Sequence, residues 1–138
     1  MQYDEFIKRV QERANLESLE EAVRATEATL ETLGERLYLH RTERRHLASQ
    51  LPKELGEYLL KRQGDGHYLL EEFYNRVSAR MDVGYPHAVN RAQAVMAVLR
   101  AAVASGEWEH IQSELPDEYD ELLGEEPEIP EASSYETI

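Results

Sequence analysis

The sequence contains no cysteine, so it can form neither disulfides nor thiolate-based catalytic or metal sites. It also lacks long hydrophobic runs: its most apolar stretch, residues 92–99, is far shorter than the ~20 apolar residues that span a bilayer. The first ten residues, MQYDEFIKRV, are charged from the fourth position and hold no apolar segment typical of a signal peptide. We therefore expect a cytoplasmic protein that does not act in a membrane.

Positive charge is scarce as well. The chain has 15 Lys and Arg against 28 Asp and Glu, a net charge of −13 at pH 7. Because binding to a phosphate backbone depends on Lys and Arg side chains, this composition argues against a nucleic-acid partner. Residues 124–138 hold no positive charge and almost no apolar side chain, which predicts an acidic, disordered C-terminal tail.

The apolar residues that are present follow a helical period. No segment of useful length alternates apolar and polar residues as a half-buried strand does. Instead, Phe6, Val10 and Ala14 are spaced by four residues, and Phe73 and Val77 repeat that spacing. The pattern predicts an all-α protein.

The sequence also repeats itself. Residues 5–10 (EFIKRV) match residues 72–77 (EFYNRV) at four of six positions. Residues 42–55 (TERRHLASQLPKEL) align with residues 106–119 (GEWEHIQSELPDEY), 64 positions later. We therefore predict two tandem, pseudo-symmetric multi-helix repeats that form one compact helical domain: repeat 1 over residues 1–62, a hinge over 63–66, repeat 2 over 67–123 and the acidic tail over 124–138.

Each repeat is predicted to contain one long helix of about five turns, which begins near Ser18 in the first copy and near Pro86 in the second. A short helix follows and ends at Leu51 or Leu115, because each is followed by proline, which disfavours α geometry in the residue before it. The predicted core comprises Phe6, Val10, Leu30, Leu33, Leu47, Leu51, Phe73, Val77, Val95, Leu99, Ile111 and Leu115.

The paired segments LASQLPKEL and IQSELPDEY, together with the EF-x-x-V pattern near the start of each unit, resemble a bacterial family catalogued as domain of unknown function 2267. The resemblance covers residues 3 to about 123. It implies a short, helical, internally duplicated protein, and it brings no activity, cofactor or functional residue to this chain.

Two Glu-x-x-His motifs are the strongest candidates for a metal site. Glu43 and His46, and again Glu107 and His110, lie three residues apart, which places a carboxylate and an imidazole on one helical face. Paired motifs of this kind contribute to the di-iron sites of four-helix bundles. However, Glu43 and Glu107 fall in a first helical turn, where a carboxylate complements the helix dipole. We therefore expect no metal or other cofactor, with His46 and His110 exposed and far apart.

A basic cluster is the second candidate, because it stands out in an acidic chain. As a partner-binding site it would hold an acidic protein or the chain's own tail. In the alternative that we favour, Arg36, His40 and Arg41 satisfy the carbonyls at the end of the long helix. The cluster comprises Arg36, His40, Arg41, Arg44 and Arg45.

Trp108, the only tryptophan, is expected on the inward face of its helix, and its counterpart in the first repeat is Arg44. This asymmetry either marks a groove or reflects an arginine whose stem packs while its head group reaches water. No nucleophile elbow, dinucleotide fingerprint or P-loop is present. The function is thus not set by a motif: we expect a non-enzymatic interaction or scaffold module with an unknown protein partner or a second copy of itself. The alternative is a metal-binding, di-iron-like protein.

Overall fold

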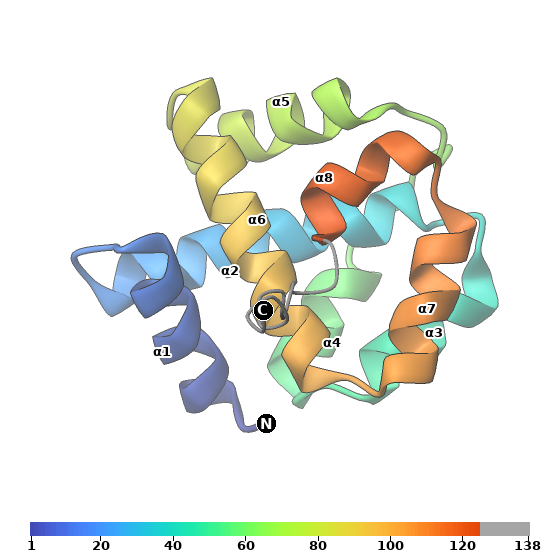
Figure 1. The fold of residues 1–138 in the computed structure, drawn as a ribbon, viewed down its shortest axis with the longest axis horizontal. Coiled ribbons are helices and arrows are strands. Elements are labelled where there is room, and N and C mark those ends of the chain that lie inside the picture. Colours follow the sequence, from blue (N-terminus) through green and yellow to red (C-terminus); the bar gives the residue numbers. More distant parts are fainter. Residues whose placement is uncertain (125–138) are drawn as a thin grey trace, which may run out of the picture.

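The computed structural model of the protein describes residues 1–124, and in this part every regular element is a helix, as the sequence predicts (Figure 1). The predicted disorder of the tail concerns residues that, apart from Gly124, lie outside the described part. No helix among the described residues is both long enough and apolar enough to cross a membrane. The elements are α1 (Tyr3–Ala14), α2 (Leu19–Arg36), α3 (Arg41–Ser49), α4 (Lys53–Leu60), α5 (Leu70–Met81), α6 (Tyr85–Ala102), α7 (Ser105–Glu114), a 3₁₀ turn η1 (Asp117–Tyr119) and α8 (Asp120–Leu123).

Local sequence signals explain where the helices begin and end. The Ser18 hydroxyl accepts a 3.1 Å hydrogen bond from the backbone N–H of Glu21, which caps the start of α2. Asn15 ends α1 in the left-handed conformation, at φ 57°, and Asp82 ends α5 in the same way. The short helices α3 and α7 end at Ser49 and Glu114, before the two Leu-Pro pairs and within two residues of the predicted ends.

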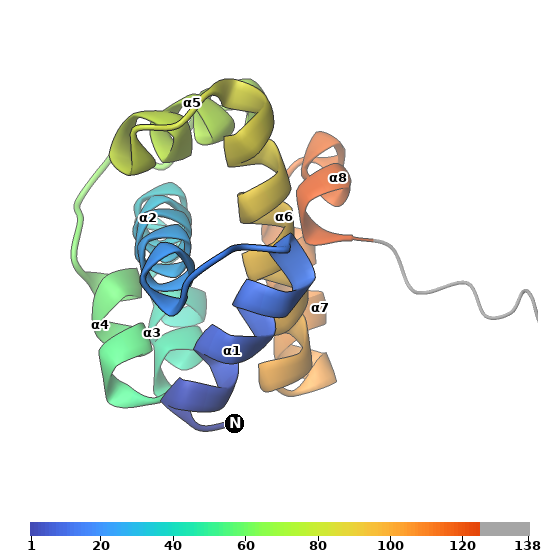
Figure 2. The same ribbon diagram turned by 90° about the vertical axis from the view of Figure 1, so that its left-hand side faces the viewer.

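Helix α2 runs through the centre of the molecule. It packs against α1, α4, α5 and α6, and the view along its axis shows it between these helices (Figure 2). Residues 31–37 are all buried, so the second half of α2 has no solvent face. At Gly34 the backbones of α2 and α4 touch so closely that a Cβ would lie 1.8 Å from the Leu59 carbonyl oxygen.

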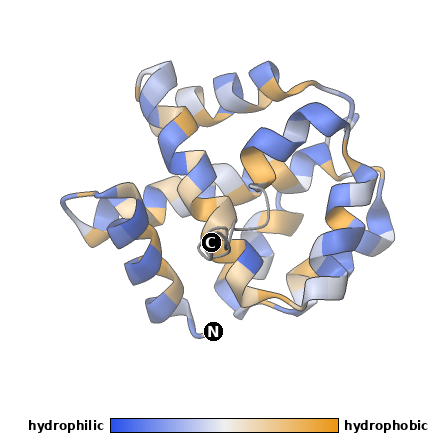
Figure 3. Cartoon of the chain, in the orientation of Figure 1, coloured by the Kyte–Doolittle hydropathy of each residue, from blue (hydrophilic) through white to orange (hydrophobic). Residues whose placement is uncertain are grey.

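The core draws on every long helix. Hydrophobic residues recur along each helix rather than gathering in one continuous segment (Figure 3). All of the core residues predicted from the sequence are buried, and they belong to one cluster that spans both halves of the chain. The largest fully buried side chains include Trp108, Tyr74, Tyr119, Phe6 and Phe73.

The two halves of the chain run in parallel in their element lengths. Helices α1 and α5 each have 12 residues, and α2 and α6 each have 18, which is the predicted length of about five turns. The two halves differ at their ends. In the first half α3 is followed by α4, whereas in the second half α7 is followed by η1 and the short α8. The duplication and its boundaries stay a prediction from the sequence.

Charged side chains tie α2 to its neighbours. The buried carboxylate of Glu31 lies 3.0 Å from Lys61 Nζ and 2.8 Å from Arg62 Nε, at the end of α4. One turn later, Glu35 lies 3.1 Å from Arg76 and 3.0 Å from Arg80, both on α5. The carboxylates of Glu31 and Glu35 are thus each met by two cations, which offsets the cost of their burial.

Candidate functional site

The structure does not bring the five basic candidates together on one surface. Arg36 is the last residue of α2 and is only 5% exposed. Its Nε donates to the Tyr68 carbonyl (2.7 Å) and to the Tyr119 hydroxyl (3.0 Å), and its guanidinium also donates to the Gly66 carbonyl. Arg36 therefore joins α2 to the segment before α5 and to η1, instead of satisfying the end of its own helix.

Arg44 is buried as well. Its Nε donates to the Leu59 carbonyl (3.0 Å) and its Nη2 to the Arg62 carbonyl (2.7 Å), and its guanidinium lies over the Tyr38 ring. Burial lowers the pKa of this guanidinium. Arg44 thus caps the carboxyl end of α4, so the snorkelling alternative is wrong for this arginine: its head group binds carbonyls rather than water. Of the remaining candidates, Arg41 and Arg45 are exposed.

The two Glu-x-x-His motifs, in contrast, come together. Glu43 Oε2 lies 3.6 Å from His110 Nδ1, and His40 Nδ1 lies 2.6 Å from Glu114 Oε1. Residues later in α3 pair with residues earlier in α7, so the two helices are antiparallel. The two motifs thus pair Glu with His across the two helices, which motif spacing did not predict, and His46 and His110 are both exposed, as predicted. We call this contact the α3–α7 seam, formed by His40, Glu43, His46 and Gln50 against Ala104, Glu107, His110 and Glu114.

Glu107 is the unusual member of the seam. It is only 7% exposed, and its Oε2 has no hydrogen-bond partner. Burial raises the pKa of its carboxyl, and the carboxylate of Glu43 raises it further, whereas His46 and His110 oppose the rise. Within residues 1–124 no three His, Asp or Glu side chains are arranged to hold a metal ion.

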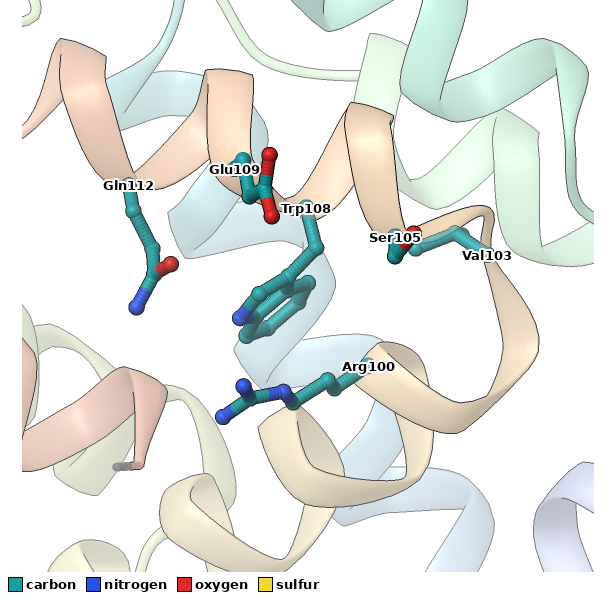
Figure 4. Close-up of a pocket in the computed structure, with 6 residues that line it drawn as sticks. All are labelled: Arg100, Val103, Ser105, Trp108, Glu109 and Gln112. Carbon is teal, nitrogen blue, oxygen red and sulfur yellow. The ribbon is translucent and has the colours of Figure 1, made fainter. Parts of the chain in front are cut away.

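The opposite face of α7 lines a pocket with α6 (Figure 4). Its volume is about 320 Å³, and its floor is the indole of Trp108, which is 2% exposed. The indole Nε1 has no hydrogen-bond partner, and it points to the same end of the pocket as the Gln112 amide and the Arg100 guanidinium. We call it the Trp108 pocket; its lining residues are Arg100, Val103, Ser105, Trp108, Glu109 and Gln112.

A match to a family model shows which protein family the chain belongs to. The family model described as "Uncharacterized conserved protein (DUF2267)" matches residues 3–122. The chain belongs to this family. No curated protein matches the sequence of this DUF2267 protein. Its function therefore has to be argued from its own residues.

Several residues of these two sites in the DUF2267 protein were not candidates from sequence, among them Arg100, Gln112 and Glu114. Arg100 lies 5.8 Å from the Trp108 ring centre and donates to the Gly124 carbonyl (3.1 Å). Gln112 lines the same pocket, and Glu114 pairs with His40 across the seam. A helical period places these side chains on faces of α6 and α7, but it does not state which helix each face meets. The one usable signal was the exchange of Arg44 for Trp108 between the aligned segments.

Proposed function

We propose that this DUF2267 protein is a non-enzymatic helical module that binds a protein partner at the Trp108 pocket, and that it works in the cytoplasm. The observation that carries the proposal is the unpaired indole N–H of Trp108. A buried donor without an acceptor costs about 1–3 kcal/mol, and such a group in a native protein calls for a specific explanation. An acceptor supplied by a partner accounts for it once binding moves aside the side chains that cover this solvent-inaccessible N–H.

The composition of the pocket supports a peptide segment as the ligand. Trp108 and Arg100 belong to the residue types that dominate the energetics of protein interfaces. The Gln112 amide adds a donor at the same end of the pocket (Figure 4). The indole N–H and the Gln112 amide are both donors, so together they suit a carbonyl or carboxylate oxygen on the partner.

Site-specific photo-crosslinking in the native host tests the proposal. A photoreactive residue at position 112, in the pocket, is expected to yield one protein adduct, and the same residue at the exposed position Glu20 on α2 is expected not to. The substitution Trp108→Phe keeps most of the ring packing but removes the N–H, so it should abolish the adduct at position 112. Equal adducts at both positions, or an adduct that survives Trp108→Phe, would refute the proposal. An adduct of twice the chain mass would identify the partner as a second copy.

A further inference from the structure

Two faces of helix α7 contact different helices. Trp108 faces α6 and the pocket, whereas Glu107, the residue before it, faces α3. His110 and Glu114 continue the α3 face one and two turns later. Whatever fixes α7 against α3 therefore also fixes the indole in its pocket.

The pairing across the α3–α7 seam follows from the repeated motif and the antiparallel helices. Glu and His are three residues apart on both helices, so an antiparallel pair sets each Glu opposite the other helix's His. Glu43 accordingly meets His110 at 3.6 Å, and Glu107 interacts with His46. A third pair, His40 with Glu114 at 2.6 Å, closes one end of the seam. At the other end the Gln50 side chain accepts a 2.9 Å hydrogen bond from the backbone N–H of Ala104, just before α7.

Imidazole groups as a class change charge between about pH 5 and 8. Buried Glu107, with its raised pKa, favours the protonated form in the folded protein, so its contribution to stability falls as pH rises above the ordinary carboxyl value. The charged groups that act on Glu107 are Glu43, His46 and His110; on the α6 side, the cation near α7 is Arg100, which lies against Trp108.

We infer that the α3–α7 seam is a proton-operated clasp: the imidazolium–carboxylate pairs of His110 with Glu43 and of His40 with Glu114, together with the protonated carboxyl of Glu107, hold α7 against α3, and the loss of these protons loosens α7. The clasp regulates the Trp108 pocket, and only this last step rests on the proposed function. Each partly exposed pair shifts the equilibrium between docked and loosened α7 by about twofold to fivefold. The two charge pairs together shift it by roughly fourfold to twenty-fivefold.

The single tryptophan allows a direct test on the full chain. Trp108 is almost fully buried, so its fluorescence emission should move to longer wavelength as the pH is raised from 5.5 to 8, while far-ultraviolet circular dichroism keeps its helical signal. The double substitution His46→Gln and His110→Gln should remove most of this shift. The matched control is His67→Gln with His87→Gln, which alters two exposed histidines outside the seam and should leave the shift intact.

A second variant keeps the test decisive if the double substitution disturbs folding. Glu107→Gln mimics the protonated carboxyl, so it should reduce the emission shift by itself. The clasp is refuted if emission does not depend on pH, if the control pair removes the shift, or if both seam variants titrate like the parent protein.

The regulatory step is tested separately from the clasp. Crosslinking at position 112 in a lysate at pH 6 and at pH 8 should give different adduct yields, and the His46→Gln, His110→Gln variant should give equal yields. An emission shift without any adduct would support the clasp and overturn the proposed function. An adduct that is independent of pH in the parent protein would overturn control of the pocket.

Discussion

Replacing Gly34 with alanine places a methyl group where the backbone of α4 runs. The added Cβ would lie 1.8 Å from the Leu59 carbonyl oxygen and 2.6 Å from its carbonyl carbon, whereas real Cβ contacts essentially never fall below 3.0 Å. Both neighbours are backbone atoms, so no side chain can rotate away. Helices α2 and α4 must separate by about an ångström, which also pulls the Leu59 carbonyl from its 3.0 Å hydrogen bond with Arg44.

The magnitude follows from three terms. Overpacking of a close contact costs about 1–3 kcal/mol. Loss of the hydrogen bond between Arg44 and Leu59 leaves a buried group unpaired, at about 1–3 kcal/mol. The better helix propensity of alanine returns about 1 kcal/mol. We expect Gly34→Ala to lower the free energy of unfolding by about 1–5 kcal/mol.

The chain provides a control of opposite sign. A Cβ at Gly106, in the first turn of α7, would meet no atom within 4 Å. Gly106→Ala should therefore raise the free energy of unfolding, by up to about 1 kcal/mol. Urea denaturation followed by circular dichroism measures both variants. A midpoint for Gly34→Ala at or above that of the parent protein would refute the close approach of α2 and α4.

Three further predictions use the same denaturation assay. Phe73→Ala, at a fully buried position, should cost about 3–5 kcal/mol, and a change within ~0.5 kcal/mol would contradict its place in the core. Arg36→Met should cost about 2–4 kcal/mol because it strands buried carbonyls, and Arg36→Lys should not restore stability, since an ammonium group lacks the planar fork. Burial raises the pKa of Glu31 and Glu35, but their Arg and Lys partners lower it more, to below the ordinary 4.5, so their stabilisation should be lost as pH falls below about 4.5. Glu35→Gln should flatten this acid-side slope, and an unchanged slope would count against the ion pairs.

The helix ends and the core could be read from the sequence because both depend on local rules. Proline after Leu51 and Leu115 stops a helix in any context, and a four-residue apolar spacing identifies the inward face of a helix that lies at the surface. The core residues on α1 and α5 were accordingly predicted correctly. The same signals do not show which residues of other helices these core side chains contact.

The candidate site was predicted less well for a physical reason. A helical period assumes one buried face, but the second half of α2 is enclosed on all sides, so Arg36 became an interior residue instead of a surface one. Arg44 was misjudged because the carbonyls that it binds belong to Leu59 in α4 and to Arg62 just after it, 15 and 18 positions away. The meeting of Glu43 with His110 depends on how α3 and α7 cross, and motif spacing carries no information about that.

The central position of α2 has a consequence for how the protein loses its structure. Helix α2 belongs to the first half of the sequence, yet it packs against α5 and α6 of the second half, and α1 packs against α6. Neither half keeps a complete core when the other melts. Although the two halves of the sequence resemble each other, the chain should unfold in one cooperative transition. In a linear repeat array, by contrast, the units can unfold one after another.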